Sequence, residues 1–111
     1  MLFRSSQPSE QELLQNILQP LLTDFEYWFS KSVELLNGAQ MPFLSQAAQA
    51  DLLNRVKQAR QEVNTSQMLF QAIDGQVGVE PSQMLTWHQL VTECWQVSMQ
   101  LRQSQQTKIE E

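Results

Sequence analysis

The stretch SEQELLQNILQPLLTDFEYWFSKSVELLNG, residues 9–38, decides the fold class. Its apolar side chains recur at alternating steps of four and three residues, a spacing that places them on one face of an α-helix. Ser9 and Glu12 form the capping-box pattern of a helix start, and Asn37-Gly38 is typical of a helix end. The stretch therefore predicts one long amphipathic helix. The expected buried seam is Leu14, Leu18, Leu21, Phe25, Trp28, Ser32 and Leu35, widened by Ile17, Leu22, Phe29, Val33 and Leu36.

Pro20 lies inside this predicted helix. Proline has no N–H group, and its ring crowds the carbonyl four residues earlier. The sequence therefore predicts a first helix that is kinked, or locally broken, near residues 16–19.

Two further segments repeat the heptad spacing. The second begins after Ser45, its predicted N-cap, and stops at Asp74-Gly75; the third starts at Pro81-Ser82. Three helices of roughly 25–30 residues with short connections favour antiparallel packing of neighbours. We therefore predict an all-α fold, an elongated antiparallel three-helix bundle. The expected buried positions are Leu52, Val56, Ala59, Val63, Ser66, Phe70 and Ile73 in the second segment, and Met84, Trp87, Val91, Cys94, Ser98 and Leu101 in the third.

The chain has 111 residues, which indicates one domain with tails. We expect an N-terminal tail over 1–9, the bundle over 10–102 and a polar, fraying C-terminal tail over 103–111. A domain of this size buries roughly two thirds of the surface of its unfolded chain, enough for one core.

Charge and composition exclude several classes of function. The formal net charge is −5, and the seven Lys and Arg residues are scattered, which argues against binding to nucleic acid or to anionic membranes. No apolar run approaches the ~20 residues of a membrane span, and the first residues lack a signal-peptide core. A single cysteine excludes an intrachain disulfide, so we expect a cytoplasmic protein.

The stretch WHQLVTECW, residues 87–95, holds the only histidine, the only cysteine and two of the three tryptophans. At 100° per residue, Cys94 lies about 20° from Trp87 on the buried face, whereas His88 lies about 100° away, in line with Trp95. The two side chains therefore do not form a thiolate–imidazole pair within this helix. We predict that Cys94 is a buried, unreactive core residue, and that His88 is half-buried at the bundle margin.

Metal and catalytic chemistry find little support. One histidine and one cysteine leave a zinc site short of ligands, and a single histidine excludes the paired Glu-x-x-His motifs of di-iron bundles. The stretch DGQVGVEPS, residues 74–82, has a Gly-x-x-Gly spacing but no following lysine, which indicates an interhelical loop rather than a phosphate loop. We predict no metal, no cofactor and no enzymatic activity, although catalysis by paired carboxylates stays open as a third hypothesis.

Two surfaces are candidates for binding. In DFEYWFSKS, residues 24–32, Tyr27 lies about 140° from the centre of the seam, on the flank that it shares with Pro20, Asp24 and Lys31. A rigid aromatic side chain beside a helix kink is a typical ingredient of an interface. The leading hypothesis is therefore a non-enzymatic adapter, assembly factor or regulator that binds a protein partner. The alternative is a bundle that binds a small molecule or pigment at His88 and Trp95.

Self-association is also expected, as a homodimer. Long helices with heptad patterns on a small domain leave apolar surface that a symmetric copy covers.

Five stretches resemble a known family in their order and spacing: PLLTDFEYWFSKS, PFLS, NRVKQARQEV, DGQVGVEPS and WHQLVTECW. They are similar to a family of short cyanobacterial proteins that is catalogued only as a domain of unknown function. The resemblance covers roughly Glu10 to Arg102, and the last two stretches are its most specific part. It implies a photosynthetic prokaryote and a protein of the cytosol, or of the cytosolic side of thylakoids. It implies no activity, cofactor or catalytic residue.

Overall fold

The computed structural model describes residues 10–72 and 80–110, and the side chains of 16–72 and 80–105. Within these ranges the chain forms three α-helices and no strand: α2 (Glu10–Gly38), α3 (Gln46–Ala72) and α4 (Pro81–Glu110). This confirms the predicted all-α three-helix architecture. It also shows α4 continuing past Arg102, where we expected the bundle to end, as far as Glu110.

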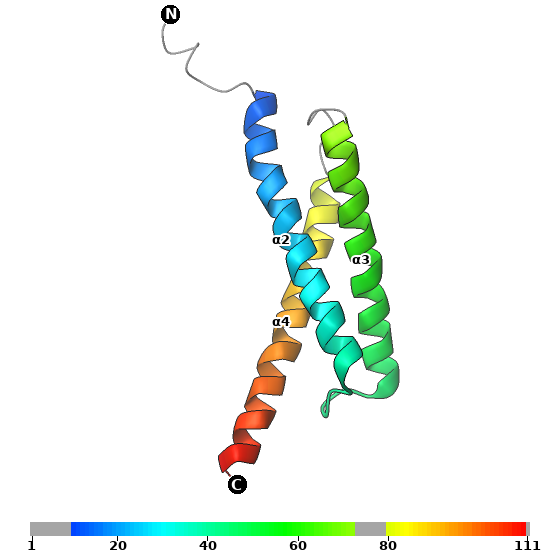
Figure 1. Cartoon of the computed structure of the whole chain (residues 1–111), viewed down its shortest axis with the longest axis vertical. Helices are drawn as coiled ribbons and strands as arrows, with labels where there is room; N and C mark the ends of the chain where they lie inside the picture. The colour runs from blue at the N-terminus through cyan, green and yellow to red at the C-terminus, as the bar shows by residue number, and fades with distance from the viewer. Residues whose placement is uncertain (1–9, 73–79, 111) are drawn as a thin grey trace, which may run out of the picture.

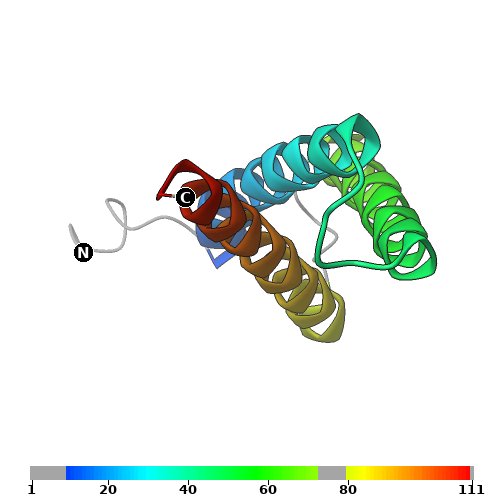
Figure 2. The same cartoon turned by 90° about the horizontal axis from the view of Figure 1, so that it is seen from below.

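The three helices run in alternating directions and form an elongated bundle (Figure 1). α2 and α3 lie side by side and antiparallel, and α2 is in closest contact with α3. α4 runs in the same direction as α2 and crosses it, and its C-terminal end extends beyond the connection between α2 and α3 (Figure 1). Seen from below, the three helix axes do not lie in one plane (Figure 2). One side of α4, which carries Trp95 and Met99, is exposed to solvent.

Local signals set the helix ends where the sequence placed them. The Ala48 amide donates a hydrogen bond to the Ser45 hydroxyl at 3.0 Å, which confirms Ser45 as the N-cap of α3. α4 begins at Pro81, whose missing N–H is not needed in a first turn. α2 ends at Gly38 as predicted. Ser9, the first member of the predicted capping box, and the Asp74-Gly75 pair lie outside the described residues.

Pro20 does not interrupt α2, which continues as one helix on both sides of it. The local break that we considered near residues 16–19 therefore does not occur, and the kink stays a prediction. Pro20 is exposed. The Thr23 hydroxyl donates to the Gln19 carbonyl oxygen at 3.0 Å in the same turn.

The core confirms most of the expected seams but shifts the one on α2. Phe29 is fully buried, as expected. Three residues that we placed in the buried stripe are instead exposed: Ile17 at 56%, Leu21 at 36% and Trp28 at 40%. The apolar arc of α2 is wider than the surface that α3 and α4 cover, so one edge of it stays in solvent. The described core is Leu22, Phe25, Phe29, Val33, Leu36, Met41, Leu52, Val56, Ala59, Val63, Trp87, Leu90, Val91, Cys94 and Val97.

Gln49 is the one buried polar side chain among the described residues. Its Oε1 atom accepts a hydrogen bond from the Met41 amide at 2.7 Å. Its Nε2 atom donates to the carbonyl oxygens of Leu36 at 2.9 Å and Ala39 at 2.8 Å. Carbonyls at a helix C-terminus have no partner within the helix. Gln49 therefore ties the end of α2 and the following connection to the first turn of α3.

Candidate functional site

Two aromatic side chains stand on the outer flank of α2. Tyr27 is 53% exposed, as the helix phase predicted. Its ring meets that of Trp28 edge to face, with the centroids 5.1 Å apart. The Lys31 Nζ atom lies 5.8 Å from the centroid of the Tyr27 ring, within reach of a cation–π contact. Lys31 also faces Glu34 at 3.9 Å. Tyr27 and Lys31, two of the four candidate residues on this flank, therefore lie against one another.

The Trp28 ring connects this flank to α4. The centroids of Trp28 and Trp95 are 5.5 Å apart and their planes are nearly perpendicular, the edge-to-face arrangement that aromatic pairs favour. Trp95 is 45% exposed and belongs to the alternative ligand margin. The structure thus brings residues of the two candidate surfaces together in one row of rings that runs from Tyr27 through Trp28 to Trp95.

His88 was predicted to be half-buried, and this prediction was wrong. The side chain is exposed, because α2 covers α4 on the side of Trp87 and Cys94 and leaves the flank of His88 in solvent. The Thr92 hydroxyl donates to the backbone carbonyl of His88 at 3.0 Å. His88 lies one heptad before Trp95, on the same flank of α4.

Further large apolar side chains extend the row of rings. On α2, Ile17 is 56% exposed and precedes Leu21 by one turn, and Leu21 precedes Trp28 by one heptad. On α4, Met99 follows Trp95 by one turn and is also exposed. We name this surface of α2 and α4 the aromatic face. It comprises Ile17, Leu21, Tyr27, Trp28, Trp95 and Met99.

A small hollow opens in the aromatic face. It has a volume of about 210 Å³ and is lined by Trp28, Trp95, Ser98, Met99 and Arg102. Its walls are mainly apolar, and its one charged member is Arg102. Arg102 is exposed, and no carboxylate of the described residues pairs with it. The aromatic face therefore offers a shallow apolar socket with a cation at its edge.

Beneath the aromatic face lie the residues of WHQLVTECW that we predicted to be core. Trp87 is fully buried and meets Phe25 edge to face, with the centroids 5.5 Å apart. Its indole N–H donates to Glu62 Oε1 at 3.2 Å. Cys94 is buried, as predicted. Burial raises the pKa of its thiol, and a hydrogen bond with Ser32 opposes this shift.

The opposite side of α4 faces α3 across a groove of about 450 Å³. Arg55 bridges it with two hydrogen bonds to the carboxylate of Glu93, at 2.7 and 3.1 Å, and also contacts Asp51 at 2.9 Å. The hydrogen bond to Glu93 is the main cause that raises the pKa of Arg55. The apolar floor of this groove, Ala59, Trp87 and Leu90, is already buried within the bundle. The groove therefore has an apolar floor, and two of its charged side chains, Arg55 and Glu93, already pair with one another across it.

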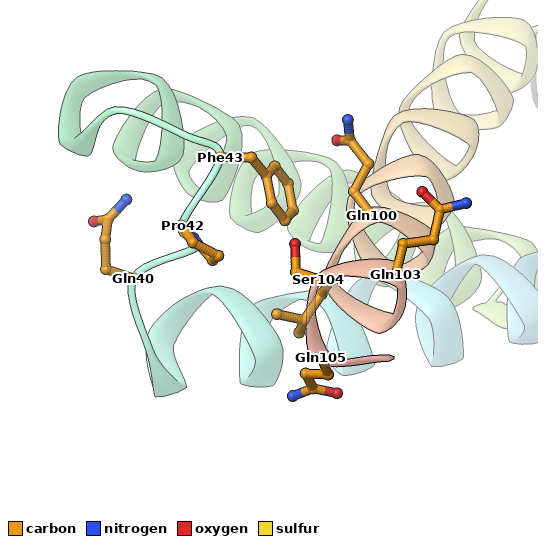
Figure 3. Close-up of a pocket in the computed structure, with 8 residues that line it drawn as sticks. Gln40, Pro42, Phe43, Gln100, Gln103, Ser104 and Gln105 are labelled. Carbon is orange, nitrogen blue, oxygen red and sulfur yellow. The ribbon is translucent and has the colours of Figure 1, made fainter. Parts of the chain in front are cut away.

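A second hollow, of about 690 Å³, lies between the α2–α3 connection and the end of α4. Figure 3 shows the Phe43 ring pointing from the connection toward α4. The amides of Gln100, Gln103 and Gln105 point in different directions and do not converge on one point (Figure 3). Specific ligand sites place a few polar groups around one position, and this hollow does not.

Other classes of site find no geometric support in the part of the chain that the structure describes. Over 16–72 and 80–105, no three His, Cys, Asp or Glu side chains are grouped so that they could hold a metal ion. No described helix is both long and apolar enough to cross a membrane. The predicted loop at DGQVGVEPS falls mostly outside the described residues.

Comparison with known proteins identifies the family. The model of the family described as "Protein of unknown function (DUF2605)" matches residues 8–103. The chain belongs to this family. No curated protein and no solved structure matches the chain.

The DUF2605 match includes all three helices up to Gln103, and so every residue of the aromatic face and of its hollow. It confirms the resemblance to a family of unknown function that the sequence motifs indicated. The family description states no activity.

The sequence indicated the α2 part and the α4 part of the aromatic face, but not that the two parts lie in contact. Helical rotation alone placed Tyr27 outside the seam and Trp95 beside His88. The contact between Trp28 and Trp95 depends on the axial position of α4 relative to α2. No pattern within either helix specifies this position. The exposed Trp28 and Leu21 were missed because both fit the expected heptad seam.

Proposed function

We propose that this chain is a non-enzymatic helical interaction protein, an adapter, assembly factor or regulator, which binds a protein partner through the aromatic face. We place it in the cytoplasm of a cyanobacterium, in keeping with the sequence resemblance. The observation that carries the proposal is the exposed row of rings formed by Tyr27, Trp28 and Trp95.

The composition of the aromatic face fits an interface. Tyr, Trp and Met are enriched at the cores of protein interfaces, and Trp and Tyr are frequent hot spots. The edge-to-face contacts hold Trp28 between Tyr27 and Trp95, so these rings lose little side-chain entropy when a partner binds. Covering the six exposed side chains removes apolar surface from water, which drives association.

The size of the hollow favours a protein partner over a pigment. Pockets for small molecules usually enclose about 300–1,000 Å³ and bury most of the ligand. The hollow beside Trp28 and Trp95 has about 210 Å³ and lies at the surface. It accommodates one side chain of a partner more readily than a whole cofactor.

Affinity capture from a cyanobacterial lysate tests the proposal. The wild-type chain, Tyr27→Ala and Trp95→Ala serve as baits, and each is first checked for an unchanged helical circular dichroism spectrum. A hot spot costs about 2 kcal/mol or more when truncated, so each variant is expected to capture roughly 30-fold less partner. Met68→Ala is the matched control, because Met68 is a 71% exposed apolar residue on α3, outside the aromatic face.

Equal capture by all four baits would refute the aromatic face as the binding surface. A second copy of the chain is the other occupant to consider, since we expect a homodimer. Light scattering on the wild-type chain and on Trp95→Ala separates the two cases. A dimer that Trp95→Ala converts to a monomer would assign the aromatic face to self-association instead of a partner.

A further inference from the structure

We infer that the partner segment that occupies the aromatic face is an acidic amphipathic α-helix, which places an apolar side chain in the hollow and a carboxylate on Arg102. This inference rests on the proposed function and names the chemistry of the partner. It follows from three features of the face: its satisfied backbone, the direction of its apolar rows and its local charge.

The backbone of the aromatic face excludes strand pairing and is compatible with a helical partner. The face consists of the interiors of α2 and α4, where N–H and C=O groups are bonded within the helices. It therefore offers no free backbone edge to which an extended strand could pair. A partner that covers the face must satisfy its own backbone groups, and an α-helix does so.

The exposed apolar side chains follow the axes of the two helices. Ile17, Leu21 and Trp28 span roughly 16 Å along α2 at 1.5 Å per residue. Trp95 and Met99 form the second row, on α4. Because α4 runs in the same direction as α2 and Trp28 packs against Trp95, the two rows meet at this pair and continue one another. A continuous apolar stripe of this kind suits a partner helix whose apolar side chains are spaced by three, four and seven residues.

The hollow provides room for one anchoring side chain. Its volume is about 210 Å³, between Trp28 on one side and Trp95 and Met99 on the other. An apolar cavity of about 150 Å³ in another protein holds a benzene molecule. A leucine or phenylalanine side chain therefore fits between these walls.

The charges of the face differ from those of the whole chain. The net charge is −5, but the hollow is lined by a cation, Arg102, to which no described carboxylate is paired. α4 runs in the same direction as α2, so Arg102, which follows Trp95, lies toward the Lys31 end of the face. Glu34 partly neutralises Lys31 there, and Asp24 lies toward the other end. Arg102 is thus the site of charge complementarity with an acidic partner.

Two synthetic helical peptides test the inference on the full-length chain. Both carry the same leucine stripe over about 18 residues, and their flanks are either glutamate or lysine. The fluorescence of Trp28 and Trp95 reports binding, because both are exposed whereas Trp87 is buried. The wild-type chain is expected to prefer the glutamate peptide, with an affinity that falls as salt is added.

Reversal of one charge gives the decisive comparison. Arg102→Glu is expected to weaken binding of the glutamate peptide about five- to tenfold and to strengthen binding of the lysine peptide. Lys57→Glu changes the net charge equally at an exposed site on α3 and is expected to leave both affinities unchanged.

The outcomes separate this inference from the proposed function. The inference of an acidic partner helix is wrong if the wild-type chain binds neither peptide or prefers the lysine peptide. It is also wrong if Arg102→Glu and Lys57→Glu change the two affinities equally. Loss of lysate capture in Trp95→Ala would still support the aromatic face in that case. Equal lysate capture by Trp95→Ala and the wild-type chain would instead remove the proposed function itself.

Discussion

At the scale of single residues, Cys94 shows how burial determines the chemistry of a side chain. The thiol is enclosed by the core between α2 and α4, and burial raises its pKa because a thiolate there would lose its hydration. Thiolates, and not thiols, are the reactive form of cysteine. Cys94, the side chain with the greatest potential reactivity in the sequence, is therefore a packing residue of the core.

We predict a pH-dependent contribution of Cys94 to stability. The folded-state pKa is raised, so the contribution is complete below the pKa of an unfolded cysteine, about 8.5. It then declines with rising pH until the folded-state pKa is reached, by at most about 1.4 kcal/mol per pH unit. Cys94→Ala should accordingly cost on the order of 1 kcal/mol at pH 7 and clearly less at pH 10.

Urea unfolding of both proteins at the two pH values measures this difference. Other titrating groups are shared by the two proteins and cancel in the comparison. A difference that does not change with pH would contradict the account of a buried neutral thiol.

At the scale of the helices, Gln49 joins two elements through one side chain. It satisfies the Leu36 carbonyl at the end of α2, and the Ala39 carbonyl and the Met41 amide of the following connection. The sequence contains 19 glutamines, and most of those described lie on exposed helix surface. No local pattern distinguishes Gln49, because its partners belong to the preceding helix and connection.

We predict that Gln49→Leu destabilises the fold by about 3 kcal/mol. Each buried polar group that loses its partner costs about 1–3 kcal/mol, and this substitution leaves Leu36, Ala39 and Met41 without theirs. Gln61→Leu is the matched control, because Gln61 is exposed on the same helix and such surface substitutions usually stay within about 0.5 kcal/mol. Chemical denaturation of the two variants compares their free energies of unfolding. Equal values would contradict the stabilising role of the Gln49 hydrogen bonds.

The helices themselves were predictable because their signals are local. Each signal acts only on the few residues beside it: Ser45 as an N-cap, Pro81 in a first turn and Gly38 at a helix end. The buried edge of α2 was not predictable in the same way. Its apolar arc spans both Phe29 and Trp28, and only the placement of α3 and α4 decides which of these is covered.

At the scale of the whole molecule, α4 determines where the proposed binding surface lies. Because α4 crosses α2 (Figure 1), it buries Trp87 and Cys94 and leaves Trp95 and Met99 in solvent beside Trp28. On the α3 side, the Arg55–Glu93 ion pair bridges the groove between α3 and α4. The aromatic face gathers the exposed rings of Tyr27, Trp28 and Trp95, and for this reason we propose it as the binding surface.

Site-specific photocrosslinking in living cells tests the aromatic face as a binding surface most directly. A photoreactive amino acid replaces Met99 on the aromatic face in one strain and Met68 on α3 in another. Both positions are more than half exposed, so the probe is accessible to solvent in each strain. We predict a discrete crosslinked product of higher mass from position 99 and none from position 68. A product from position 68 alone, or equal products from both positions, would contradict the account.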